Sequence, residues 1–205
     1  METITVNSLD GAYEQCSSLV NHINGDGLTL LNDLIGTVKS LKGNWIGNDA
    51  SKHINNLMKV YDGLHALLSD AKGYVCFAGS RVIAMQQVRS ANGGGGNVGE
   101  YLNSEELEHI RLPECQPTNE YKVEPAAAND LTSLQKECEQ FDSFMSKFLE
   151  IKTDLMSNWS AGARREKAEE CFEELAQNSE SYKKMMAAAR ENLETAVANI
   201  GKLEG

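Results

Sequence analysis

Four histidines, five cysteines and a run of glycines are the residues of this chain whose chemistry first suggests a site. The histidines are His22, His53, His65 and His109. They stand far apart, and none is spaced with cysteines or carboxylates as metal ligands are. His53 lies at the edge of a stripe of regularly spaced apolar residues, which predicts a partly buried, neutral imidazole. The four glycines at 93–96 are not followed by Gly-Lys-Ser/Thr, and no expected strand precedes them, so they do not form a phosphate loop.

The cysteines are odd in number and include no Cys-x-x-Cys pair, which favours reduced thiols in a protein made in the cytosol. They are Cys16, Cys76, Cys115, Cys138 and Cys171. If the first half of the chain folds back about residue 46, Cys16 and Cys76 face each other. A disulfide between them is then the alternative to two free thiols.

Acidic pairs such as Glu169-Glu170 and Glu173-Glu174 predict a solvated helix face, and we find no nucleophile with a base spaced beside it. We therefore expect a protein that is not an enzyme and takes no cofactor or metal.

The composition indicates which partners to expect. With 19 Lys and Arg against 30 Asp and Glu, the formal charge is −11, which disfavours nucleic acid and anionic lipid surfaces as partners. Apolar runs fall short of the roughly 20 residues that span a bilayer, so we expect no stable membrane insertion. The first residues lack a basic stretch followed by an apolar one, so we expect no cleaved signal peptide. A 6% aromatic content and three prolines favour helices over strands.

Apolar residues recur at alternating spacings of four and three, which is typical of long packed helices. The first seam is Leu9, Tyr13, Cys16, Val20, Ile23, Gly27, Leu30, Leu34, Val38 and Leu41. Asn24-Gly-Asp-Gly27 has the composition of a turn, yet the seam keeps its phase across it. We therefore expect one long helix, kinked at this point. A second seam follows from Ala50 to Met85.

The pattern stops after Ser90 and returns after Pro125. The third seam runs from Leu131 to Trp159, and the fourth from Ala168 to Leu203. The sequence therefore predicts a helical hairpin over 1–91, a Gly- and Pro-containing linker over 92–125 with a short helix at 104–110, and a second hairpin over 126–205. Each hairpin alone leaves apolar surface exposed, so we predict an all-α, left-handed four-helix bundle of two antiparallel hairpins.

The bend Asn44-Trp45-Ile46-Gly47 between two apolar helices resembles the WXG-motif family of early-secreted-antigen-like proteins. These are small acidic helical hairpins that bacterial type VII secretion exports. The second bend has Trp159 and Gly162, with the glycine one position late, so the chain is similar to a fused pair whose second member is degenerate. The family's second export element, Tyr-x-x-x-Asp/Glu, is matched by Tyr101 and Glu105. The resemblance implies that these two residues lie beside Trp159.

The resemblance implies a protein that is made in the bacterial cytoplasm and secreted, or that accompanies a secreted effector. Its expected partners are the type VII secretion ATPase and an effector or another WXG-type protein. The bundle could close within one chain or in a homodimer. The alternative is a cytosolic helical adaptor with no export role, in which Trp45 is an apolar plug and Gly47 supplies backbone freedom. A targeting module of a toxin is a third interpretation, disfavoured because no catalytic domain follows.

Overall fold

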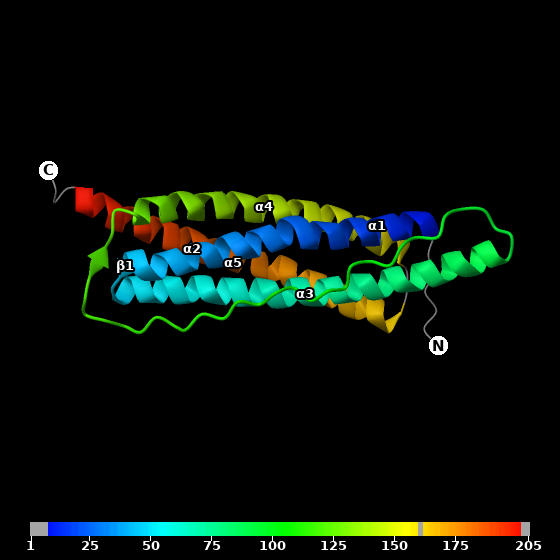
Figure 1. The fold of residues 1–205 in the computed structure, drawn as a ribbon, viewed down its shortest axis with the longest axis horizontal. Coiled ribbons are helices and arrows are strands. Elements are labelled where there is room, and N and C mark those ends of the chain that lie inside the picture. The colour runs from blue at the N-terminus through cyan, green and yellow to red at the C-terminus, as the bar shows by residue number, and fades with distance from the viewer. Residues whose placement is uncertain (1–7, 160–161, 202–205) are drawn as a thin grey trace. The chain divides into compact units, whose positions relative to one another are not determined.

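The computed structural model describes residues 8–159 and 162–201, which are mostly helical (Figure 1). In chain order the elements are α1 (Leu9–His22), the π-helix η1 (Ile23–Gly27), α2 (Leu28–Asn44), β1 (Trp45–Ile46), α3 (Asn48–Ala91), β2 (Lys122–Val123), α4 (Ala127–Asn158) and α5 (Ala163–Gly201). The all-α prediction is confirmed. The predicted breaks after residue 90 and after Trp159 coincide with the ends of α3 and α4. The left-handed supercoil and the pairing into hairpins stay predictions.

The chain forms two compact units, each with helical segments from both halves of the sequence. Unit 1 contains α1, η1 and residues 66–91 of α3, 144–158 of α4 and 163–177 of α5. Unit 2 contains α2 from residue 29, β1, β2 and residues 48–65 of α3, 127–143 of α4 and 178–201 of α5. Each unit is therefore a small helical bundle with its own core.

The predicted seams supply most of that core. In unit 1 the buried seam residues include Cys16, Val20, Leu68, Val75, Phe148 and Phe172. In unit 2 they include Leu34, Val38, Ile54, Leu57, Phe141 and Leu193. The seam is wider than predicted on α4, where Glu137 and Ile151 are buried while the predicted Cys138 and Lys152 are half-buried. The helix packs a broader face than a strict two-per-heptad seam would.

The helical backbone continues through Asn24–Gly27 as the π-helix η1, so the prediction of one continuous helical stretch over 9–44 is confirmed. At this point His22 stacks on Phe144, with ring centroids 4.6 Å apart, and its Nε2 lies 3.0 Å from the carbonyl oxygen of Phe144. A Cβ on Gly27 would lie 3.1 Å from the Phe144 ring. The absence of a side chain at Gly27 lets the aromatic ring approach the helix.

The segment between α3 and α4 is extended and lies along α3 (Figure 1). The short helix predicted at 104–110 is wrong, because these residues have no regular structure. Instead, β2 near the end of this segment pairs antiparallel with β1, with Trp45 opposite Val123. The linker is thus attached to the first bend, which the sequence pattern did not predict.

Candidate functional site

The first bend places Gly47 directly before α3. Gly47 has φ 147°, a backbone conformation that strongly favours glycine. Its carbonyl accepts a hydrogen bond from the amide of Ser51 at 2.9 Å, which begins the helical ladder. A Cβ on Gly47 would lie 3.3 Å from the ring of Tyr121. Both the backbone and the neighbouring ring therefore favour glycine here, as the sequence predicts.

The Trp45 side chain is buried, with 3% of its surface exposed. Its ring stacks on His53, with centroids 5.9 Å apart and planes 12° from parallel. Burial, with a smaller contribution from Lys52, lowers the pKa of His53, which favours the neutral imidazole. The prediction of a partly buried His53 is confirmed. The Trp45 ring is a packed element of unit 2 and not an exposed anchor.

Residues around the first bend attach it to the end of the linker and the start of α4. The carbonyl of Asn44 accepts from the amide of Glu124 at 2.8 Å, and its side-chain amide donates to Asp130 at 2.8 Å. These bonds lie beside the β1–β2 pair. These hydrogen bonds therefore hold the bend both to the linker and to α4.

The second bend repeats this arrangement in unit 1. Trp159 is 2% exposed, and its carbonyl accepts from Nε of Arg165 at 2.6 Å. Gly162 has φ 130° and stands directly before α5, where its carbonyl accepts from the amide of Glu166 at 3.2 Å. Residues 160 and 161 lie outside the described part. Gly47 and Gly162 therefore occupy the same position relative to the helix that follows, and the extra residue lies between Trp159 and Gly162.

Tyr101 and Glu105 lie in the extended segment of unit 1. The Tyr101 side chain is 79% exposed. The amide of Glu105 donates to the side chain of Asn103 at 2.9 Å, and its carbonyl accepts from Lys72. The Glu105 side chain is exposed. The motif is accessible, and the implied position of Tyr101 and Glu105 beside Trp159 stays a prediction.

Cys16 and Cys76 are free thiols on facing helices of unit 1. Burial, and to a smaller extent the nearby Cys76, raises the pKa of Cys16 to about 12. Burial also raises the pKa of Cys76, whose Sγ lies 3.6 Å from the carbonyl oxygen of Asn103. No bridge joins the two thiols in this structure, and their pairing stays a prediction.

Sequence reasoning missed a set of polar contacts between α3 and the linker. The side-chain amide of Asn55 and the hydroxyl of Tyr61 bind backbone atoms of the linker. Residues 108–124 of this linker, here called the strap, lie in unit 2. An asparagine and a tyrosine on a helix have many roles, and the sequence carries no signal that pairs them with residues about 50 positions later.

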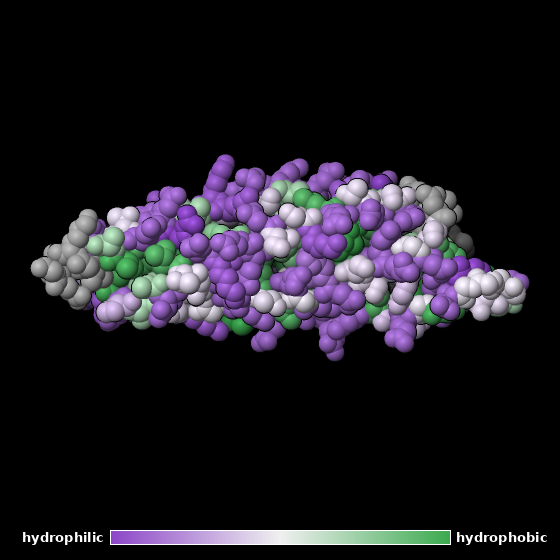
Figure 2. Space-filling view, turned by 90° about the horizontal axis from the view of Figure 1, so that it is seen from above, coloured by the Kyte–Doolittle hydropathy of each residue, from purple (hydrophilic) through white to green (hydrophobic). Residues whose placement is uncertain are grey.

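The surface is largely hydrophilic on the face that Figure 2 shows, with hydrophobic residues in smaller patches. Within residues 8–159 and 162–201, no cluster of three or more His, Cys, Asp or Glu side chains is arranged to bind a metal ion. Among the helices described, none is long and apolar enough to span a membrane.

Comparisons with protein family models, curated proteins and solved structures found no match to this chain. The resemblance to the WXG-motif family therefore rests on the residues of the bends and on the linker motif.

Proposed function

We propose that this chain is a non-enzymatic substrate or targeting partner of a bacterial type VII secretion system, built as a fused pair of WXG-type hairpins. The observation that carries this proposal is the repeated bend: a buried tryptophan followed by a positive-φ glycine directly before a long helix. It occurs at Trp45 and Gly47 and again at Trp159 and Gly162. In this proposal the protein is made in the cytoplasm and exported by that system.

The exposed linker motif supports the proposed binding of this chain to secretion partners. Tyr101 and Glu105 are both accessible in a segment without regular structure, where a partner can bind them. The proposed partners are the type VII secretion ATPase and either an effector or another WXG-type protein.

An export assay tests the motif directly. Tyr101→Ala should lower the amount of protein in the culture supernatant at least fivefold while leaving the cellular amount unchanged. Tyr121→Ala is the matched control, because Tyr121 is 68% exposed in the same linker but has no acidic residue four positions later. Equal export of both variants and the unmodified chain would contradict a role for Tyr101.

The rival proposal, a cytosolic adaptor whose tryptophans are structural, is favoured by one observation: both Trp45 and Trp159 are buried. Absence of the unmodified chain from the supernatant, in a host with a working type VII system, would favour this rival. Size-exclusion chromatography with light scattering would distinguish a monomer from a homodimer in either case.

A further inference from the structure

The strap is bound to the helices of unit 2 through its own main chain. The side chain of Asn55 makes two hydrogen bonds with a single strap residue, Cys115. Its Nδ2 donates to the Cys115 carbonyl at 2.9 Å, and its Oδ1 accepts from the Cys115 amide at 2.8 Å. A carboxamide that pairs with both backbone groups of one residue recognises an extended chain irrespective of its side chains.

Three further helix side chains bind strap backbone atoms. The Tyr61 hydroxyl accepts from the amide of Ile110 at 2.8 Å. The Ser51 hydroxyl donates to the carbonyl of Gln116 at 3.0 Å, and Lys42 donates to the carbonyl of Pro113. Together with the Asn55 contacts, these hydrogen bonds bind the strap backbone between residues 110 and 116.

Side chains of the strap contribute much less to its attachment. No residue of the strap, which the structure describes throughout, is fully buried. The strap side chain that binds the helices is that of His109, which pairs with Asp62 at 2.8 Å and stacks on Tyr61 with centroids 5.6 Å apart. Its ring centroid also lies 4.5 Å from that of His65. The helices therefore recognise the backbone of the strap more than its sequence.

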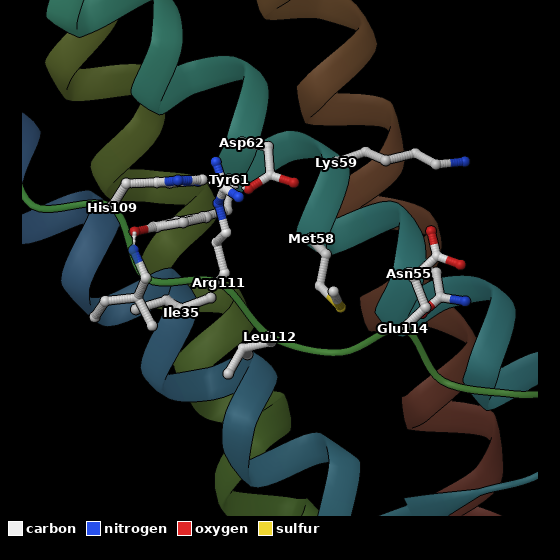
Figure 3. Close-up of a pocket in the computed structure, with 11 residues that line it drawn as sticks. Ile35, Asn55, Met58, Lys59, Tyr61, Asp62, His109, Arg111, Leu112 and Glu114 are labelled. Atoms are coloured by element: carbon white, nitrogen blue, oxygen red, sulfur yellow. Dashed lines mark hydrogen bonds and ion pairs between the residues drawn. The ribbon is translucent and has the colours of Figure 1, made fainter.

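A cavity of about 350 Å³ remains under the strap between the Tyr61 and Asn55 contacts. Figure 3 shows Met58 of α3 projecting into this space, and Leu112 of the strap lies at its edge. Ile35 adds to its apolar lining, and charged side chains, among them Lys59 and Glu114, surround it. Leu112 is half-buried and leaves most of this space unfilled.

We propose that this face of unit 2 is a binding groove for an extended peptide, which the strap occupies in the absence of a partner. The partner is a protein segment in extended conformation that carries a bulky apolar side chain, such as Trp or Phe, at the position of Leu112. The backbone contacts select the extended conformation, and the cavity selects the large side chain. This inference goes beyond the proposed function and does not depend on it.

The tethered strap competes with any such partner at a high effective concentration, so the test uses a chain in which the strap is weakened. Ile110→Pro combined with Cys115→Pro removes both strap amides that donate to Tyr61 and Asn55, and it leaves every helix residue of the groove unchanged. The probe is a fluorescent peptide of residues 107–118 that carries Leu112→Trp, with Cys115→Ser to prevent oxidation.

Fluorescence anisotropy should show this peptide binding the double-proline chain at least tenfold more tightly than the unmodified chain. The same peptide with Leu112→Gly should bind at least tenfold more weakly. Adding Asn55→Leu to the double-proline chain should also weaken binding at least tenfold. Adding Asn56→Leu, the neighbouring asparagine for which the structure shows no strap contact, should leave binding unchanged. Circular dichroism would verify that each variant keeps its helices.

A second measurement does not depend on the proline variants folding. In the otherwise unmodified chain, Leu112→Trp should fill the cavity and slow hydrogen exchange at the amides of Ile110 and Cys115 at least fivefold. Equal binding of the peptide to the Asn55→Leu and Asn56→Leu chains would overturn the proposal. So would exchange that is unchanged or faster in Leu112→Trp.

Discussion

The hydroxyl of Thr37 on α2 donates a hydrogen bond to the carboxylate of Glu137 on α4, and both side chains are buried in unit 2. Only 1% of the Glu137 surface is exposed. Burial raises the pKa of Glu137 from 4.5 to about 7, although the bond from Thr37 acts in the opposite direction. A carboxyl group is thus buried among the helices, and this burial disfavours its charged form.

Glu137 should make the stability of the protein depend on pH. The folded state retains a proton on this group between pH 4.5 and about 7, whereas the unfolded state releases it. The contribution of Glu137 to the free energy of unfolding should therefore be largest below pH 4.5 and be lost as pH rises through about 7, a fall of about 3 kcal/mol at most. Urea unfolding at pH 5 and pH 8 measures this difference.

Glu137→Gln should remove most of that pH dependence, because glutamine keeps the shape of the side chain without its charge. Glu139→Gln is the control, since Glu139 is exposed on the same helix. A pH dependence that is the same in both variants would show that Glu137 is not its source.

Gly47→Ala should destabilise the protein by about 1–3 kcal/mol. The substitution forces a side chain into φ 147° and toward the ring of Tyr121. Gly43→Ala is a matched control in the last turn of α2, where a Cβ meets no atom within 4 Å. Because Gly43 is helical, its replacement should stabilise by about 0.5–1 kcal/mol. Thermal melts of the two variants should shift in opposite directions, and a parallel shift would contradict the assignment of Gly47.

Cys16 should resist alkylation in the folded protein. It is fully buried and its pKa is raised to about 12, so its thiolate fraction at pH 8 is about one in ten thousand. Cys115 is half-buried in the strap and should react first. Mass spectrometry of peptides after brief iodoacetamide treatment gives both rates. Equal rates would indicate that α1 and α3 separate readily in unit 1.

The same sample tests whether Cys16 and Cys76 form a disulfide, which is the alternative to two free thiols. The mass of the intact protein should not change on reduction, because both Cys16 and Cys76 are thiols in the structure. A mass gain of two hydrogens on reduction of the exported protein would show that the pair is oxidised outside the cell.

Trp45→Ala should lower stability by about 3–5 kcal/mol, because it leaves a large space next to His53. Circular dichroism at low temperature should still show most of the helical signal, since the core residues of the helices are unchanged. Trp45→Phe, which refills part of the space, should recover part of the loss. A Trp45→Ala variant as stable as the unmodified chain would contradict the buried position of this ring.

Helix positions were largely predictable because they depend on periodicity within one segment. The seam from Ala50 to Met85 predicted α3, and the loss of pattern after Ser90 predicted its end at Ala91. Glycines in the bends were also predictable, since a chain reversal needs backbone conformations that other residues rarely adopt. The prediction was wrong at 104–110, where local composition suggested a helix but contacts with α3 favour an extended chain.

By itself the sequence determined that the chain is helical, where its long helices end and which residues form its bends, because these properties arise from local spacing and backbone preference. Tertiary structure alone decided that Glu137 is buried in place of Cys138 and that Asn55 pairs with the backbone of Cys115. Both depend on which residues distant in the sequence meet in space, and a backbone amide offers the same hydrogen bonds whatever side chain it carries. The pairing of Asn55 with Cys115 therefore leaves no trace in residue types.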